Sequence, residues 1–220
     1  MNPRRVIIIG APRSGTTVLK KYIATSERFV LTGFPETQSE LDQEFNGIPV
    51  WKRTKWLQQS SLEELAERYG KDSCFVLIYR YPTDCYESLV DLNSRRGYHT
   101  HAWLPSRRES DFLQWWSESY VFAIEVLSKL PFKVVFSYEE FCHDPIKYRN
   151  IVCQNFGIVG ENEITYKNDE LLTAGSLIKE DEKTFRTNFV NASSVFRAAP
   201  NEPANILYNE ILLKIEDELE

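Results

Sequence analysis

The chain has 220 residues, of which 42% are hydrophobic and 13% aromatic, and its formal net charge at pH 7 is -6. This length and apolar content predict a single domain, spanning residues 1–220, with one large hydrophobic core. The acidic balance gives no basis for a surface that binds nucleic acid or anionic membranes, so both of these function classes are excluded.

The few cysteines and histidines favour an intracellular protein without a metal site. The four cysteines lie in apolar contexts and show neither a CxxC motif nor a metal-ligand spacing, which indicates reduced core thiols: Cys74, Cys85, Cys142 and Cys153. None of the three histidines is spaced as a ligand pair with a cysteine. Because no run of about twenty apolar residues is present, we expect no membrane span and a cytoplasmic location.

Apolar periodicity predicts strands and helices that alternate along the chain. The expected elements, in order, are a strand at about 5–9, helices at about 15–25 and 61–69, a strand at about 74–79, helices at about 83–92 and 110–129, a strand at about 132–136, and helices at about 145–156 and 204–219. Residues 26–56 and 93–109 are expected to be irregular. The alternation predicts an α/β fold, in which a mainly parallel sheet is flanked by helices on both faces.

A glycine loop, G-A-P-R-S-G-T-T at residues 10–17, follows the first predicted strand. Backbone N–H groups and the positive end of the next helix converge there, and the glycines at both ends allow a phosphate to approach closely. The phosphate-binding pattern G-x-x-x-x-G-K-[ST] has a lysine where this chain has Thr16, and the chain has Arg13 inside the loop instead. This difference argues against Mg-dependent phosphoryl transfer, in which that lysine contacts the β- and γ-phosphates.

A second anion-binding pattern lies at the end of the strand predicted at 74–79. Arg80 follows this strand, and Pro82 and Asp84 favour the start of a helix directly after it. Ser88 lies further along that helix. Because ligands bind at such strand-to-helix corners in open α/β sheets, we expect Arg80 and Ser88 to hold one phosphate together. An ion pair between Arg80 and Asp84 is the alternative.

The motifs P-R-S-G-T-T and R-x-P-x-D-x-x-x-S together resemble those of PAPS-dependent sulfotransferases of the bacterial type, which have a three-layer P-loop-type fold. The resemblance implies that loop residues hold the 5′-phosphosulfate and that Arg80 and Ser88 hold the 3′-phosphate of PAPS; the loop residues are Pro12, Arg13, Ser14, Gly15, Thr16 and Thr17. It also implies transfer of a sulfuryl group, without a metal, to a hydroxyl or amine of a small-molecule or carbohydrate acceptor. A small-molecule P-loop kinase and a non-catalytic nucleotide-binding module are the alternatives.

Two further segments resemble the same family. The tract K-R-T-K resembles a region whose lysine stabilises the bridging oxygen as the S–O bond breaks, so Lys52 or Lys55 is the candidate for that role. A solvated basic turn is the alternative for this tract. Tyr138 and Glu139 begin a segment that resembles the family's Y-E-D-L-x-x-D-P element, and we interpret them as architectural.

The general base that accepts the acceptor's proton has three candidates. Glu36 is favoured because bacterial-type members of the family place a glutamate near this position. His99 and His101 lie in the loop that follows the predicted 3′-phosphate helix, and histidine titrates near neutral pH. A structural or solvated role is the alternative for each of the three, and the arginines and aromatic residues of that loop are alternatively suited to recognise an anionic acceptor.

From about residue 158 the chain no longer matches the family cleanly. The segment R-K-G-x-x-G-x-W, with which cytosolic sulfotransferases close the nucleotide site, is absent from the sequence. Basic and aromatic residues stand where such a lid is expected, and a solvated patch is the alternative: Lys179, Lys183, Phe185, Arg186, Phe196 and Arg197.

Overall fold

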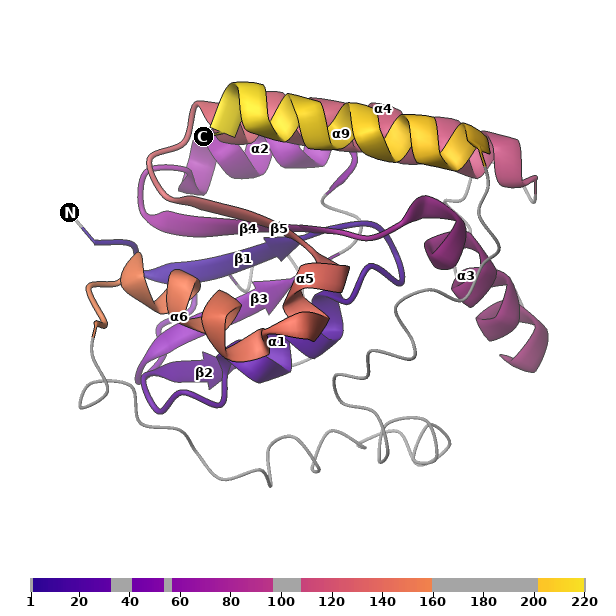
Figure 1. Ribbon diagram of the computed structural model, residues 1–220. Coiled ribbons are helices and arrows are strands. Elements are labelled where there is room, and N and C mark those ends of the chain that lie inside the picture. Colours follow the sequence, from indigo (N-terminus) through magenta and orange to yellow (C-terminus); the bar gives the residue numbers. More distant parts are fainter. Residues whose placement is uncertain (1, 33–40, 54–56, 97–107, 160–201, 220) are drawn as a thin grey trace.

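Five strands form the central sheet of the structure, a computed structural model that describes residues 2–32, 41–53, 57–96, 108–159 and 202–219 (Figure 1). The strand order is β2-β3-β1-β4-β5, and every neighbouring pair is parallel. The strands are β1 (Arg5–Ile9), β2 (Phe29–Leu31), β3 (Ile48–Lys52), β4 (Ser73–Tyr79) and β5 (Lys133–Ser137). The parallel sheet confirms the predicted α/β class.

Helices cover both faces of the sheet and complete a three-layer fold (Figure 1). One face carries α2 (Gln59–Tyr69), α4 (Glu109–Ser128) and α9 (Glu202–Leu219). The other carries α1 (Thr16–Ile23), α5 (Tyr138–His143) and α6 (Pro145–Gln154). Helix α3 (Pro82–Arg96) leaves the carboxyl end of β4 and extends away from the sheet. Within the described ranges, no helix has the length and the apolar content that crossing a membrane requires.

The alternation of side chains along β1 builds two separate cores. Ile7 and Ile9 pack on the α4 face, in one cluster with Trp51 and Trp116. Val6 and Ile8 pack on the α1 face, in a cluster with residues of α1 and α6. Because parallel strands are buried on both faces, their sequences are continuous apolar runs, and this explains why the run at residues 6–9 predicted β1 correctly.

The prediction that residues 26–56 are irregular is wrong, because β2 and β3 lie in this segment. Strand β2 has only three residues, and β3 contains Pro49 and follows Gly47, both typical of turns. Tertiary pairing stabilises these strands: Val30 lies beside Pro49, and Val50 lies beside Val6 of the central strand. A single-sequence pattern contains no signal for such pairing across the sheet.

Candidate active site

The carboxyl ends of the parallel strands bring the predicted motifs to one edge of the sheet. The glycine loop follows β1, Lys52 ends β3, Arg80 follows β4, and Tyr138 follows β5. The register places these ends side by side, since Ile8 pairs with Lys52 and Tyr79 pairs with Ser137. This edge is where open α/β sheets bind their ligands.

The glycine loop is shaped to offer backbone N–H groups at the start of α1. Gly15 is the N-cap of α1 at φ 96°, and no described side chain caps the helix there. A Cβ atom on Gly15 would collide with the ring of Tyr138. The first turn of α1, beginning with Thr16, therefore presents its N–H groups and the positive end of the helix dipole to an anion.

The other residues of the glycine loop are mostly buried and pack against one another. Pro12 and Ser14 are buried, and the Ser14 N–H donates to the Ala11 carbonyl oxygen at 3.1 Å. A Cβ atom on Gly10 would collide with the Ser14 hydroxyl, so that hydroxyl lies directly beside Gly10. Thr16 is buried and Thr17 is half-buried. Ser14 thus closes a turn of the loop through its backbone N–H, while Thr16 and Thr17 occupy the first helical turn.

Tyr120 on α4 fixes the loop to the sheet. Its hydroxyl accepts a hydrogen bond from the Ala11 N–H at 2.9 Å and donates one to the Ile78 carbonyl oxygen, also at 2.9 Å. Tyr120 is fully buried, and burial raises the pKa of its hydroxyl well above the ordinary value, so the hydroxyl keeps its proton. The sequence placed Tyr120 only on the apolar face of a helix; the signal for its role is a tyrosine where a phenylalanine would serve packing alone.

Arg13 joins the glycine loop to the second motif. Its Nε donates to the Ser88 Oγ at 2.9 Å, and its carbonyl oxygen accepts a hydrogen bond from Nη1 of Arg80 at 3.1 Å. Arg13 has φ 70°, a left-handed conformation that is uncommon for a residue with a Cβ. Three residues expected to bind the same ligand are therefore in direct contact, and the backbone is strained where they meet.

Arg80 is almost completely buried beside the hydrogen bond that it donates to Arg13. The residue is 5% exposed, and its Nη2 lies 3.8 Å from Oδ2 of Asp84, which is fully buried in the first turn of α3. The guanidinium carbon lies 4.8 Å from the centre of the Tyr138 ring. The ion pair with Asp84 therefore exists alongside the predicted phosphate site, and Tyr138 contacts both Arg80 and Gly15.

Two lysines lie at the same edge on the α1 side of the sheet. Lys52 is half-buried at the end of β3, and alternation puts it on the same face as Val50. Lys20 is buried on α1, and its Nζ donates to the Thr32 carbonyl oxygen at 3.1 Å. The sequence indicated Lys52 but missed Lys20, whose signal is a lysine one turn after Thr16 on the buried face of the helix.

Several predicted site residues lie outside the described residues: Glu36, Lys55, His99, His101 and the six candidate lid residues between 179 and 197. Their roles stay predictions. Within the described ranges, no group of three or more histidine, cysteine or acidic side chains is arranged to hold a metal ion.

Comparison with known proteins identifies one sequence family and several similar folds. The profile of the sulfotransferase domain matches residues 3–114. The fold is similar to that of a sulfotransferase domain from the curacin biosynthetic pathway, with a TM-score of 0.66 and 15% identity over 96% of this chain and 98% of that one. It is also similar to the sulfotransferase domain of the Synechococcus PCC 7002 olefin synthase (TM-score 0.63, 14% identity, 96% and 95% coverage). Mouse sulfotransferase SULT7A1, solved in complex with PAP, is similar as well (TM-score 0.55, 16% identity, 97% and 85% coverage). No curated protein sequence matches the chain significantly.

Proposed function

The chain belongs to the sulfotransferase domain family and is a transferase of sulfuryl groups, and on this premise we propose that its donor is PAPS. The acceptor that we propose is a hydroxyl or amine of a small molecule or carbohydrate. A related fold, that of the mouse sulfotransferase, holds PAP, which is PAPS without its sulfuryl group. This relationship supports PAPS as the donor.

The contacts of Arg13 are the observation that carries the proposal. The Arg13 side chain donates to Ser88, and the Arg13 carbonyl oxygen accepts from Arg80. The glycine loop therefore forms one unit with residues 80–88, where β4 leads into α3; we call this segment the α3 corner. A ligand with phosphate groups at both its 5′ and 3′ ends matches such a unit, because one end fits the α1 N-terminus and the other fits arginine and serine donors. ATP lacks a 3′-phosphate and would leave the second half of this unit unused.

The proposed chemistry follows from where the charges lie. The acceptor oxygen or nitrogen attacks the sulfur, the bond from sulfur to the bridging oxygen breaks, and its electron pair stays on the 5′-phosphate. N–H groups of Gly15, Thr16 and Thr17 would neutralise the phosphosulfate oxygens, and Lys52 or Lys55 would stabilise the charge that develops on the bridging oxygen. Glu36, His99 or His101 would take the proton of the acceptor.

Two further statements belong to this proposal. The chemistry needs no divalent metal, because backbone N–H groups and lysine or arginine side chains supply the positive charge. The four cysteines are free and buried, which supports a reducing compartment and thus a cytoplasmic location.

Calorimetric titration tests the donor. We expect adenosine 3′,5′-bisphosphate to bind at least tenfold more tightly than adenosine 5′-phosphate, and ATP with Mg²⁺ to bind no better than the latter. Incubation with PAPS and a panel of phenols, sugars and amines should release adenosine 3′,5′-bisphosphate in the presence of some acceptors. Equal affinity for the two adenosine nucleotides would contradict the proposed 3′-phosphate site.

A further inference from the structure

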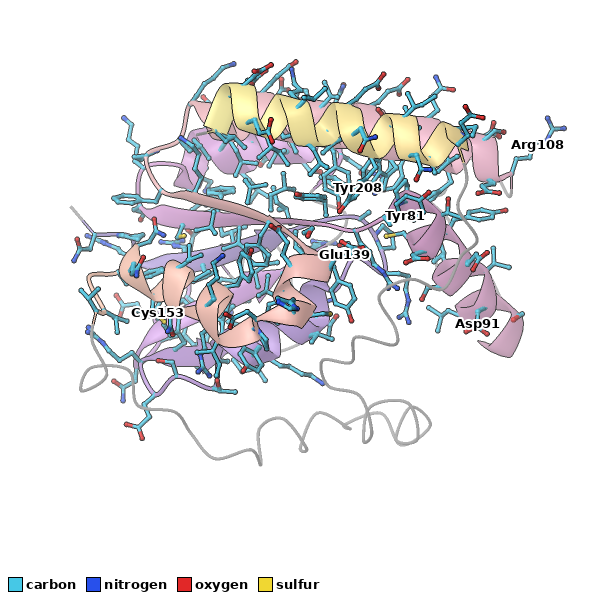
Figure 2. The ribbon with its side chains drawn as sticks, in the orientation of Figure 1. Tyr81, Asp91, Arg108, Glu139, Cys153 and Tyr208 are labelled. Atoms are coloured by element: carbon cyan, nitrogen blue, oxygen red, sulfur yellow. The ribbon has the colours of Figure 1, made fainter. Side chains whose placement is uncertain are left out.

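Glu139 connects the α3 corner to the C-terminal helix. Its Oε1 accepts a hydrogen bond from the Tyr81 N–H at 3.0 Å, and its Oε2 accepts one from the Tyr208 hydroxyl at 3.3 Å. Figure 2 shows that these three residues lie together, although Glu139 belongs to α5, Tyr208 belongs to α9, and Tyr81 lies between β4 and α3. The carboxylate thus joins three elements that are far apart in the sequence.

Helix α9 is attached to this corner by further contacts. The Tyr81 hydroxyl donates to Oδ1 of Asn205 at 2.7 Å, one helical turn before Tyr208. The Tyr208 ring packs against Tyr79 at 5.7 Å and Tyr81 at 5.6 Å between ring centres. The residues on both sides of Arg80 therefore contact the same face of α9.

The contacts bear directly on Arg80. The Tyr81 N–H belongs to the peptide bond that follows Arg80, between the end of β4 and the start of α3, so neither a strand nor a helix supplies its acceptor. Tyr138, the neighbour of Glu139, packs its ring against the Arg80 guanidinium. The first two residues of α5 therefore fix both the backbone and the side chain of Arg80.

We propose that Glu139 and Tyr208 are positioning residues for the 3′-phosphate site, so that selectivity for the 3′-phosphate depends on the attachment of α9. This inference rests on the proposed function, because it concerns the ligand of Arg80. A forked contact between guanidinium and phosphate requires a fixed orientation of both groups. Glu139 supplies this orientation through the Tyr81 peptide, and Tyr208 holds the Glu139 carboxylate in place through its second oxygen.

The test compares two variants with one matched control. Glu139→Gln keeps the shape of the side chain and one oxygen acceptor but removes the charge. Tyr208→Phe removes one hydroxyl and keeps the ring contacts. Tyr69→Phe is the control, because Tyr69 ends α2 and packs against Arg5, the first residue of β1, at the opposite edge of the sheet. For each protein, calorimetry measures the dissociation constants of adenosine 5′-phosphate and adenosine 3′,5′-bisphosphate, and thermal unfolding gives the melting temperature.

The decisive quantity is the dissociation constant of adenosine 5′-phosphate divided by that of adenosine 3′,5′-bisphosphate. A general loss of stability does not change this ratio in protein that is still folded. We expect the ratio to fall about tenfold in Glu139→Gln and severalfold in Tyr208→Phe, with Tyr69→Phe unchanged. If the wild type prefers adenosine 3′,5′-bisphosphate and both variants keep its ratio, the inference is overturned. These contacts would then have a role in stability alone. A wild-type ratio near one would instead refute the 3′-phosphate site itself, and the inference with it.

Discussion

Replacement of Arg80 should separate its role in stability from its role in binding. In Arg80→Ala the fully buried Asp84 loses the cation that lies 3.8 Å away, and the Arg13 carbonyl oxygen loses a hydrogen-bond donor. Removing one partner of a buried ion pair costs about 3–5 kcal/mol, and the long separation here favours the lower end. For a domain of this size, a loss of about 3 kcal/mol lowers the melting temperature by roughly 6–12 °C.

The double variant Arg80→Ala/Asp84→Asn serves as the matched control for stability. It removes the uncompensated charge, so we expect it to recover most of the free energy of unfolding that Arg80→Ala loses. Both proteins lack the Arg80 guanidinium, while the Arg13 guanidinium beside Ser88 remains. Both should therefore bind adenosine 3′,5′-bisphosphate more weakly by about 2 kcal/mol or more, or roughly thirtyfold, while the affinity for adenosine 5′-phosphate changes little.

Calorimetric titration of both variants measures their affinities for the two nucleotides, and thermal unfolding measures their stabilities. If the two nucleotides lose affinity equally, Arg80 does not recognise the 3′-phosphate. If the double variant is no more stable than Arg80→Ala, the pair with Asp84 is not the source of the stability loss, and the argument from burial is wrong.

Three further predictions concern single residues of the site. Lys52→Ala should lower turnover of PAPS by roughly a hundredfold or more while the affinity for adenosine 3′,5′-bisphosphate changes severalfold at most, because charge on the bridging oxygen develops only in the transition state. Unchanged turnover in a steady-state assay would show that Lys52 does not stabilise that charge. Arg13→Gly should keep the free energy of unfolding within about 1 kcal/mol of the wild-type value, because glycine accepts the positive φ, yet it should lower the affinity for adenosine 3′,5′-bisphosphate about tenfold. Denaturant unfolding and calorimetry distinguish this result from a general loss of structure. Burial raises the pKa of Glu139 above its ordinary value of 4.5, so the folded protein binds this proton more tightly than the unfolded chain, and stability falls as the pH rises from about 4.5 through the raised pKa. Glu139→Gln should lack that decline, and parallel unfolding curves for the two proteins across this range would contradict it.

Local patterns in the sequence predicted the parts of the site that are close along the chain. The apolar run at residues 6–9, the glycine loop and the spacing from Arg80 to Ser88 each specify a strand end followed by a helix start, and the structure has them there. Pro82 and Asp84 indeed begin α3. Such features depend on backbone conformation, burial periodicity and helix capping, which neighbouring residues determine among themselves.

The tertiary structure alone decided which of these parts touch. The Arg13–Ser88 hydrogen bond spans 75 positions, the Tyr120–Ala11 bond spans 109, and the Tyr208–Glu139 bond spans 69. Strand β3 likewise forms because it pairs with β1, and β2 forms because it pairs with β3, although Gly47 precedes β3 and Pro49 lies within it. In each case the stabilising partner comes from a distant part of the chain. For the Tyr120–Ala11 bond, which is buried, separation from water makes that partner necessary. The sequence by itself thus determined the fold class and the local structure of the motifs proposed to bind the ligand, and packing of the layers determined how those motifs come together.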